Sequence, residues 1–87
     1  MAIDFPAQAI EDRMRLVVSF PAVVDGRQIE CSISFEALKD RFGMSDFYDS
    51  IPHFTTHRRH IERIAANLIV HGRFENDGTI LIRAADV

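Results

Sequence analysis

The sequence has a single cysteine, Cys31, and no tryptophan among its 87 residues. One cysteine cannot form a disulfide within the chain, and the absence of a Cys-x-x-Cys pair excludes cysteine-ligated zinc sites. We interpret Cys31 as a small buried hydrophobic residue. The sequence also contains no Gly-x-Ser-x-Gly motif and no glycine-rich phosphate loop. It therefore predicts no catalytic residue and no cofactor.

The chain also lacks an excess of positive charge and any long apolar run. Ten lysines and arginines stand against thirteen aspartates and glutamates, a net charge of −3. Nucleic-acid-binding modules gain much of their affinity by neutralising phosphates, so nucleic acid is the weakest of the partner classes considered. Apolar runs of a few residues are too short to span a membrane, and residues 1–6 do not resemble a signal peptide. We expect a cytoplasmic protein without membrane contact.

The overall composition is that of a globular domain, with 47% hydrophobic and 26% charged residues. A chain of this length forms one domain, so we treat residues 1–87 as a single unit. It buries roughly 60–65% of its unfolded surface, which supplies one modest core. Little room remains for a ligand cavity of a few hundred Å³. This size argues against an enzyme.

The clearest structural signal is Asp25-Gly26 between two runs of alternating apolar residues. Asp-Gly is typical of a two-residue type I′ hairpin turn, because both positions need positive φ. This turn places Phe20 opposite Cys31 and gathers the apolar side chains on one face. The second face is mostly polar.

Three apolar residues, Val17, Pro21 and Val23, fall on that second face. We expect them to leave apolar area exposed to solvent. An exposed apolar patch is a candidate contact surface for another macromolecule.

Helical signals occupy the middle of the chain. Ser34 is a predicted N-cap of a short helix that ends at Gly43, and a long helix is predicted from about Pro52 to His71. Its core-facing stripe contains Phe54, Ile61, Ala65 and Leu68.

Strand signals flank the helices. Ile3 and Phe5 alternate as a short edge strand, residues 7–12 are a predicted loop, and residues 76–78 are a predicted hairpin turn that pairs Phe74 with Ile80. These elements predict an α+β fold. Its antiparallel sheet is built from two hairpins, with a short and a long helix between them and the long helix packed on one sheet face.

The order of several short motifs resembles one protein family across nearly the whole chain. The motifs are Phe20-x-Ala22 with Gly26, Ile29-x-Cys31-x-Ile33-Ser34, Glu36-Ala37-Leu38 leading to Phe42-Gly43, Phe54-x3-Arg58-x2-Ile61-Glu62-x2-Ala65, and Asp77-Gly78-x-Ile80. They are similar to those of domain-of-unknown-function family 1488, a group of small bacterial proteins. The resemblance implies a compact α+β fold and no particular reaction, cofactor or ligand.

The histidines His53, His57 and His60 are spaced about one helical turn apart. Neutral imidazoles at i and i+4 can chelate Zn²⁺, Ni²⁺ or Cu²⁺. A stable site needs further ligands, for which Asp46 and Asp49 are the nearest candidates. The alternative is an amphipathic helix flank whose histidines cover apolar surface. We favour the flank, expect these side chains to be partly exposed, and expect any metal bound there to be adventitious.

Two positions of the long helix, Arg58 and Glu62, lie near its apolar edge. Their i,i+4 spacing favours an ion pair that packs the arginine stem on the sheet. The functional alternative is a contact with an anion or carboxylate at the surface.

Arg59 and Arg63 point away from the stripe and extend this candidate binding site. A solvated helix face is the simpler interpretation. Nucleic-acid binding would also require exposed aromatic residues, for which Phe47 and Tyr48 are the candidates.

The sequence favours a non-catalytic binding module that contacts a protein partner or a second copy of itself. One alternative is a metal- or small-anion-binding protein that uses the long helix. A nucleic-acid binder is the weaker alternative.

Overall fold

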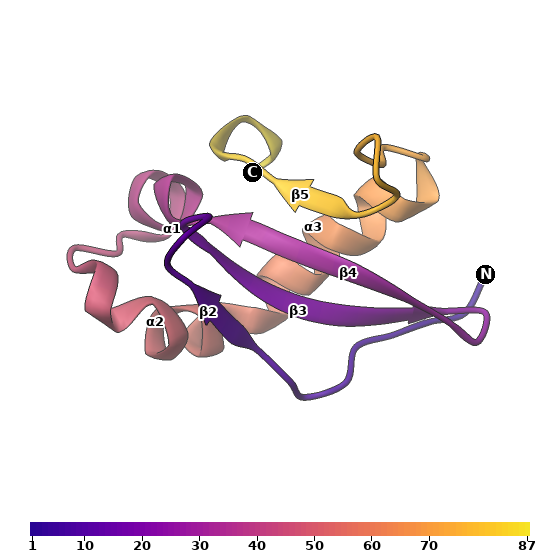
Figure 1. Ribbon diagram of the computed structural model, residues 1–87, viewed down its shortest axis with the longest axis horizontal. Coiled ribbons are helices and arrows are strands. Elements are labelled where there is room, and N and C mark those ends of the chain that lie inside the picture. The colour runs from indigo at the N-terminus through magenta and orange to yellow at the C-terminus, as the bar shows by residue number, and fades with distance from the viewer.

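The computed structural model describes residues 1–87 apart from the side chain of Phe47. The strands are β1 (Ile3–Asp4), β2 (Ile10–Asp12), β3 (Val17–Val24), β4 (Arg27–Ser34) and β5 (Ile80–Ile82). The α-helices are α1 (Phe35–Phe42), α2 (Ser50–Thr56) and α3 (Arg58–Val70), and the 3₁₀ turns are η1 (Phe47–Asp49) and η2 (Ala84–Asp86). Helices α2 and α3 lie behind one sheet face, and the other face is open (Figure 1). The predicted α+β class is confirmed.

The β3–β4 hairpin has the predicted register. Asp25 and Gly26 have φ values of 50° and 84°, as a type I′ turn requires. Phe20 lies opposite Cys31, and both side chains are buried, with exposed fractions of 1% and 0%.

Strand β5 makes the sheet mixed rather than wholly antiparallel. The predicted turn at residues 76–78 forms, since the Glu75 amide donates to the Thr79 carbonyl at 2.8 Å. Phe74 lies outside any strand and is 41% exposed. Beyond the turn, β5 pairs with β4 in parallel, with Cys31 beside Ile80. The helices between β4 and β5 supply the crossover that parallel pairing needs, and the pairing buries two isoleucines.

The edge beside β3 is interrupted opposite Pro21. Strand β1 pairs with residues 23–24 and β2 pairs with residues 17–19, so residues 20–22 have no partner on that side. With this hairpin turn, the N–H and C=O groups of odd-numbered β3 residues point toward this edge and away from β4. Proline has no N–H to offer there, so a continuous edge strand would lose a hydrogen bond. Residues 5–9, between β1 and β2, therefore bulge away from β3. The segment predicted as a loop contributes to this bulge and then forms β2.

The predicted long helix is two helices that meet at His57. The His57 amide donates to the carbonyls of both His53 and Phe54, at 3.2 and 3.1 Å. Thr55 and Thr56 donate their hydroxyls to carbonyls four residues earlier, at 2.9 and 3.0 Å. Threonines bonded in this way bend helices.

This break changes which residues of α3 face the sheet. Ile61, Ala65 and Ile69 are buried, whereas Leu68 is only partly buried at the edge of the core. The predicted stripe is therefore correct at Ile61 and Ala65 and shifts from Leu68 to Ile69 at its end.

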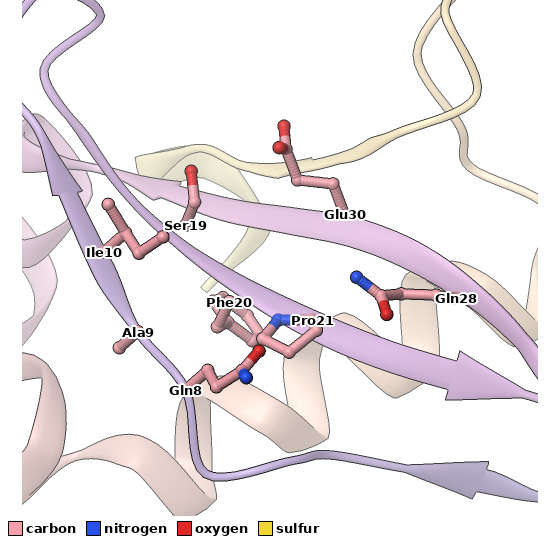
Figure 2. A pocket seen from close by; sticks show the side chains of 8 residues that line it. All are labelled: Gln8, Ala9, Ile10, Ser19, Phe20, Pro21, Gln28 and Glu30. Carbon is pink, nitrogen blue, oxygen red and sulfur yellow. The ribbon is translucent and has the colours of Figure 1, made fainter.

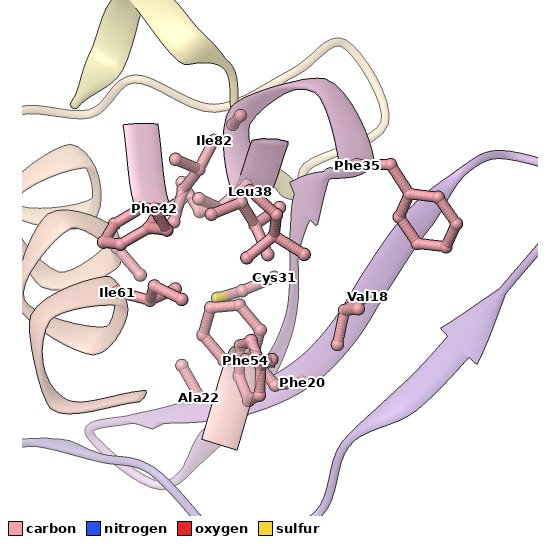
Figure 3. Packing of buried hydrophobic residues seen from close by; sticks show 14 of the residues in the cluster. Val18, Phe20, Ala22, Cys31, Phe35, Leu38, Phe42, Phe54, Ile61 and Ile82 are labelled. Carbon is pink, nitrogen blue, oxygen red and sulfur yellow. The ribbon is translucent and has the colours of Figure 1, made fainter. Parts of the chain in front are cut away.

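The core lies between the sheet and the helices. Figure 3 shows Phe20, Phe54, Ile61 and Leu38 around the thiol of Cys31. Helix α1 closes one end of this core and begins as predicted, because the Ser34 hydroxyl accepts a hydrogen bond from the Ala37 amide at 3.0 Å. No helix in the described part of the chain is both long and apolar enough to cross a membrane.

Candidate binding surfaces

Arg58 fastens the N-terminal segment to helix α3. Its Nε donates to Glu62 Oε2 at 2.8 Å, and its Nη2 donates to the carbonyls of Pro6 and Gln8 at 2.6 and 3.0 Å. The guanidinium also lies 5.2 Å from the ring centre of Phe54. The side chains of Arg58 and Glu62 are only 18% and 20% exposed. The ion pair favoured by the spacing is present, and its arginine holds the bulge between β1 and β2.

Arg59 and Arg63 have the opposite surroundings. Both are exposed on α3, and neither forms an ion pair or side-chain hydrogen bond within the described residues. Together with Phe5, Glu62 and Ala66 they line a hollow of about 210 Å³. Phe5 comes from the bulge that Arg58 holds. No local sequence pattern indicates this residue, because the bulge and α3 are about fifty residues apart in the chain.

The predicted histidine flank packs around Phe42. The ring centres of His57 and His60 lie 5.1 and 5.2 Å from that of Phe42, and His53 and His57 lie 4.9 Å apart. His53 Nε2 is hydrogen-bonded to the Phe42 carbonyl, which occupies one of its two possible metal-binding nitrogens. His53 and His57 are half-buried and His60 is exposed.

Asp46, one of the two expected acidic partners of a metal site, is engaged by a backbone amide. Asp46 Oδ1 accepts a hydrogen bond from the Tyr48 amide at 2.9 Å and so caps η1. Among the residues that the structure describes, no three or more His, Cys, Asp or Glu side chains form a group suited to a metal ion. Whether His53, His57 and His60 bind metal in solution stays a prediction.

The predicted exposed aromatic pair is described at one member only. Tyr48 is 77% exposed, and the Arg13 guanidinium lies 4.5 Å from its ring centre. The side chain of Phe47 lies outside the described residues.

The open sheet face differs from the sequence expectation. Val17 and Pro21 are buried and Val23 is half-buried, so these three residues leave little exposed apolar area. The exposed apolar residue of this face is Ile10 of β2, at 68%, which lies opposite Ser19.

A hollow of about 130 Å³ opens on this face, where the edge strand is interrupted. Figure 2 shows Gln8, Pro21 and Gln28 toward one end of it and Ile10, Ser19 and Glu30 toward the other. The prolines at positions 6 and 21 are the sequence features that could have revealed it, since each disfavours continuous pairing.

Cys31 has no catalytic environment. Burial, with a smaller contribution from the charge of Glu30, raises the pKa of its thiol to about 12. A thiol with such a pKa is a poor nucleophile, because the thiolate is the reactive form.

These features define a class: a small α+β protein with a one-sided mixed sheet and surface hollows. The family model described as "Protein of unknown function (DUF1488)" matches residues 3–82. The chain is 35% identical over 79 residues to uncharacterized protein YrdB of Escherichia coli (strain K12) and of Shigella flexneri, which covers 91% of this chain and 93% of each relative. The chain belongs to the DUF1488 family, as its motifs suggested.

A solved structure agrees with the fold. The crystal structure of a DUF1488 protein of unknown function from Shewanella loihica PV-4 matches with a TM-score of 0.84 at 26% identity. The match covers 92% of this chain and 90% of that chain. The arrangement of strands and helices is therefore shared with another member of the family.

Proposed function

We propose that this protein is a non-catalytic binding module that contacts a protein partner through the open face of its sheet. The observation that supports the proposal is the hollow on this face, lined by the apolar residues Ala9, Ile10 and Pro21 and bordered by polar side chains. No helix covers this face of the sheet (Figure 1). An apolar floor with a polar rim is the usual anatomy of a protein-binding surface.

The size of the hollow favours a protein partner over a small molecule. At about 130 Å³ it is smaller than the 300–1,000 Å³ typical of small-ligand sites. One side chain of a partner would fill it. Single side chains in such pockets often carry much of the binding energy of an interface.

The proposal includes a cytoplasmic location. Its support is the buried and unpaired Cys31, which suits a reducing compartment. The partner can be another protein or a second copy of this chain.

The test compares two substitutions at exposed apolar residues. Ile10→Glu places a charge beside the hollow, whereas Met14→Glu alters a residue that is 95% exposed and does not line it. Tagged wild-type protein is used to capture partners from its own cells, and each captured protein is then purified and titrated. We expect Ile10→Glu to weaken binding about tenfold or more, since one contact in an interface core can be worth over 1.4 kcal/mol.

The Met14→Glu variant should bind like the wild type, and both variants should keep the wild-type melting temperature. Sedimentation velocity over a concentration series detects self-association, which Ile10→Glu should also reduce. A partner whose affinity is equal for wild type and Ile10→Glu would place the interaction elsewhere and overturn the proposal.

A further inference from the structure

Of the three arginines on helix α3, two have no carboxylate partner among the described residues, and the third, Arg58, is paired. Arg13, Arg15, Arg58 and Arg83 each form an ion pair with a carboxylate. Arg59 and Arg63 form none within the described residues, although Glu62 lies between them in the sequence. Glu62 is engaged by Arg58. Two guanidinium groups one turn apart therefore remain available to an external anion.

The charge of the molecule is segregated around these arginines. Helix α3, residues 58–70, contains three arginines and one glutamate, a net charge of +2. Because the whole chain carries −3, the remaining residues carry −5. The α3 surface is a local positive region on an acidic protein.

The surface between the arginines and the sheet edge also has an apolar component. Phe5 and Ala66 are half-buried and line the same hollow of about 210 Å³ as Arg59 and Arg63. The Phe5 ring packs at 6.2 Å from that of Phe20. The two hydrogen bonds from Arg58 to Pro6 and Gln8 fix the adjoining backbone. The groove is thus held in shape by contacts that do not use Arg59 or Arg63.

We propose that this groove binds an acidic segment of a protein partner, with carboxylates at Arg59 and Arg63 and a neighbouring apolar side chain against Phe5 and Ala66. The inference rests on the proposed function as a protein-binding module but uses a different surface. Carboxylates suit the site better than nucleic acid does. A long polyanion would extend beyond the groove onto a chain whose residues outside α3 carry a net charge of −5, whereas a few carboxylates interact within the screening distance of about 8–10 Å.

The probe is a synthetic peptide of alternating glutamate and leucine, with a glutamine-leucine peptide as its neutral counterpart. Binding is followed by the chemical shifts of the backbone amides of the isotopically labelled protein. We expect saturable shifts at residues 5 and 59–66 with the acidic peptide only. We also expect affinity to fall about tenfold as salt rises from about 0.05 to 0.5 M, because the guanidinium groups are exposed.

Two double variants each remove two positive charges, one pair inside the groove and the other pair outside it. Arg59→Gln with Arg63→Gln should weaken acidic-peptide binding about fivefold or more. Lys39→Gln with Arg73→Gln alters two exposed residues that do not line the groove, so it should leave the affinity within about twofold. An equal loss in both double variants, or no saturable binding of the acidic peptide, would overturn the inference. Tighter binding of a single-stranded DNA oligonucleotide than of the peptide would also overturn it.

The Ile10→Glu variant separates this inference from the proposed function. It should bind the acidic peptide like the wild type, because Ile10 does not line the groove. If a captured partner binds the Ile10→Glu variant normally but no longer binds the Arg59/Arg63 variant, the sheet-face proposal is wrong and the groove inference is supported. The reverse pattern overturns the groove alone.

Discussion

The thiol of Cys31 illustrates how strongly a single residue responds to its place in this fold. The side chain has no exposed area, and burial raises the pKa to about 12 from an ordinary value of 9.0. The neutral thiol is therefore the form that the folded state accommodates. A raised folded-state pKa stabilises the fold below the unfolded pKa, and this stabilisation is lost as the pH rises toward the folded value.

We predict that Cys31 is inert in the folded protein. At about pH 8 the fraction of thiolate should be roughly a thousandfold lower than in the unfolded chain. A thiol reagent followed by absorbance should react promptly in denaturant and only at the rate of unfolding without it. Between about pH 9 and 12 the wild type should also lose more stability than Cys31→Ala, which lacks the titrating group. Rapid labelling of native protein would contradict the buried position.

At the scale of elements, the break at His57 sets the phase of α3. Ile61 is fully buried, whereas Leu68 is partly exposed and Val70 is 59% exposed. We therefore expect substitutions of these side chains by alanine to lower the free energy of unfolding by amounts that follow their burial along α3.

We predict that Ile61→Ala lowers the free energy of unfolding by about 3–5 kcal/mol and Leu68→Ala by about 1–2 kcal/mol, because cost follows burial and cavity size. Val70→Ala, the control, should change it by less than about 0.5 kcal/mol. Urea denaturation measures all three variants. A larger loss for Leu68→Ala than for Ile61→Ala would mean that α3 continues the phase of α2 without a break.

Local patterns in the sequence predict the elements whose causes are local. Asp25-Gly26 fixes the hairpin register, and the spacing of Arg58 and Glu62 predicts their ion pair. The partners of Arg58 in the bulge, and the position of Phe5 beside α3, depend on contacts between distant segments and leave no local pattern. The parallel pairing of β5 is missed for the same reason: a turn motif specifies the turn and not the strand that finally pairs beyond it.

For the molecule as a whole, the apolar core is continuous from the sheet to all three α-helices. Burial of this core supplies the largest favourable contribution to the stability of a domain of this size. The histidine cluster at Phe42 lies at the margin of this core.

We predict that the untagged protein contains no stoichiometric metal as purified, and that a chelator leaves its melting temperature unchanged. His53 has one ring nitrogen engaged by the Phe42 carbonyl, and imidazoles without orienting carboxylates bind metal weakly. Elemental analysis and thermal melts with and without chelator make the measurement, with His71→Ala as a control outside the cluster. Bound zinc at one equivalent, together with a lower melting temperature in chelator, would reverse this interpretation.

The parallel pairing of β5 with β4 also imposes an order of events on folding. The β3–β4 hairpin joins neighbours in the sequence, whereas Ser32 meets Ile80 across 48 positions, so β5 docks only after a long loop has closed. Ile80 and Ile82 are fully buried in the finished fold. Until they arrive, the apolar side chains beside β4 remain open to water. We therefore expect docking of a strand of three residues to set how long each newly made chain is exposed to chaperones and to aggregation.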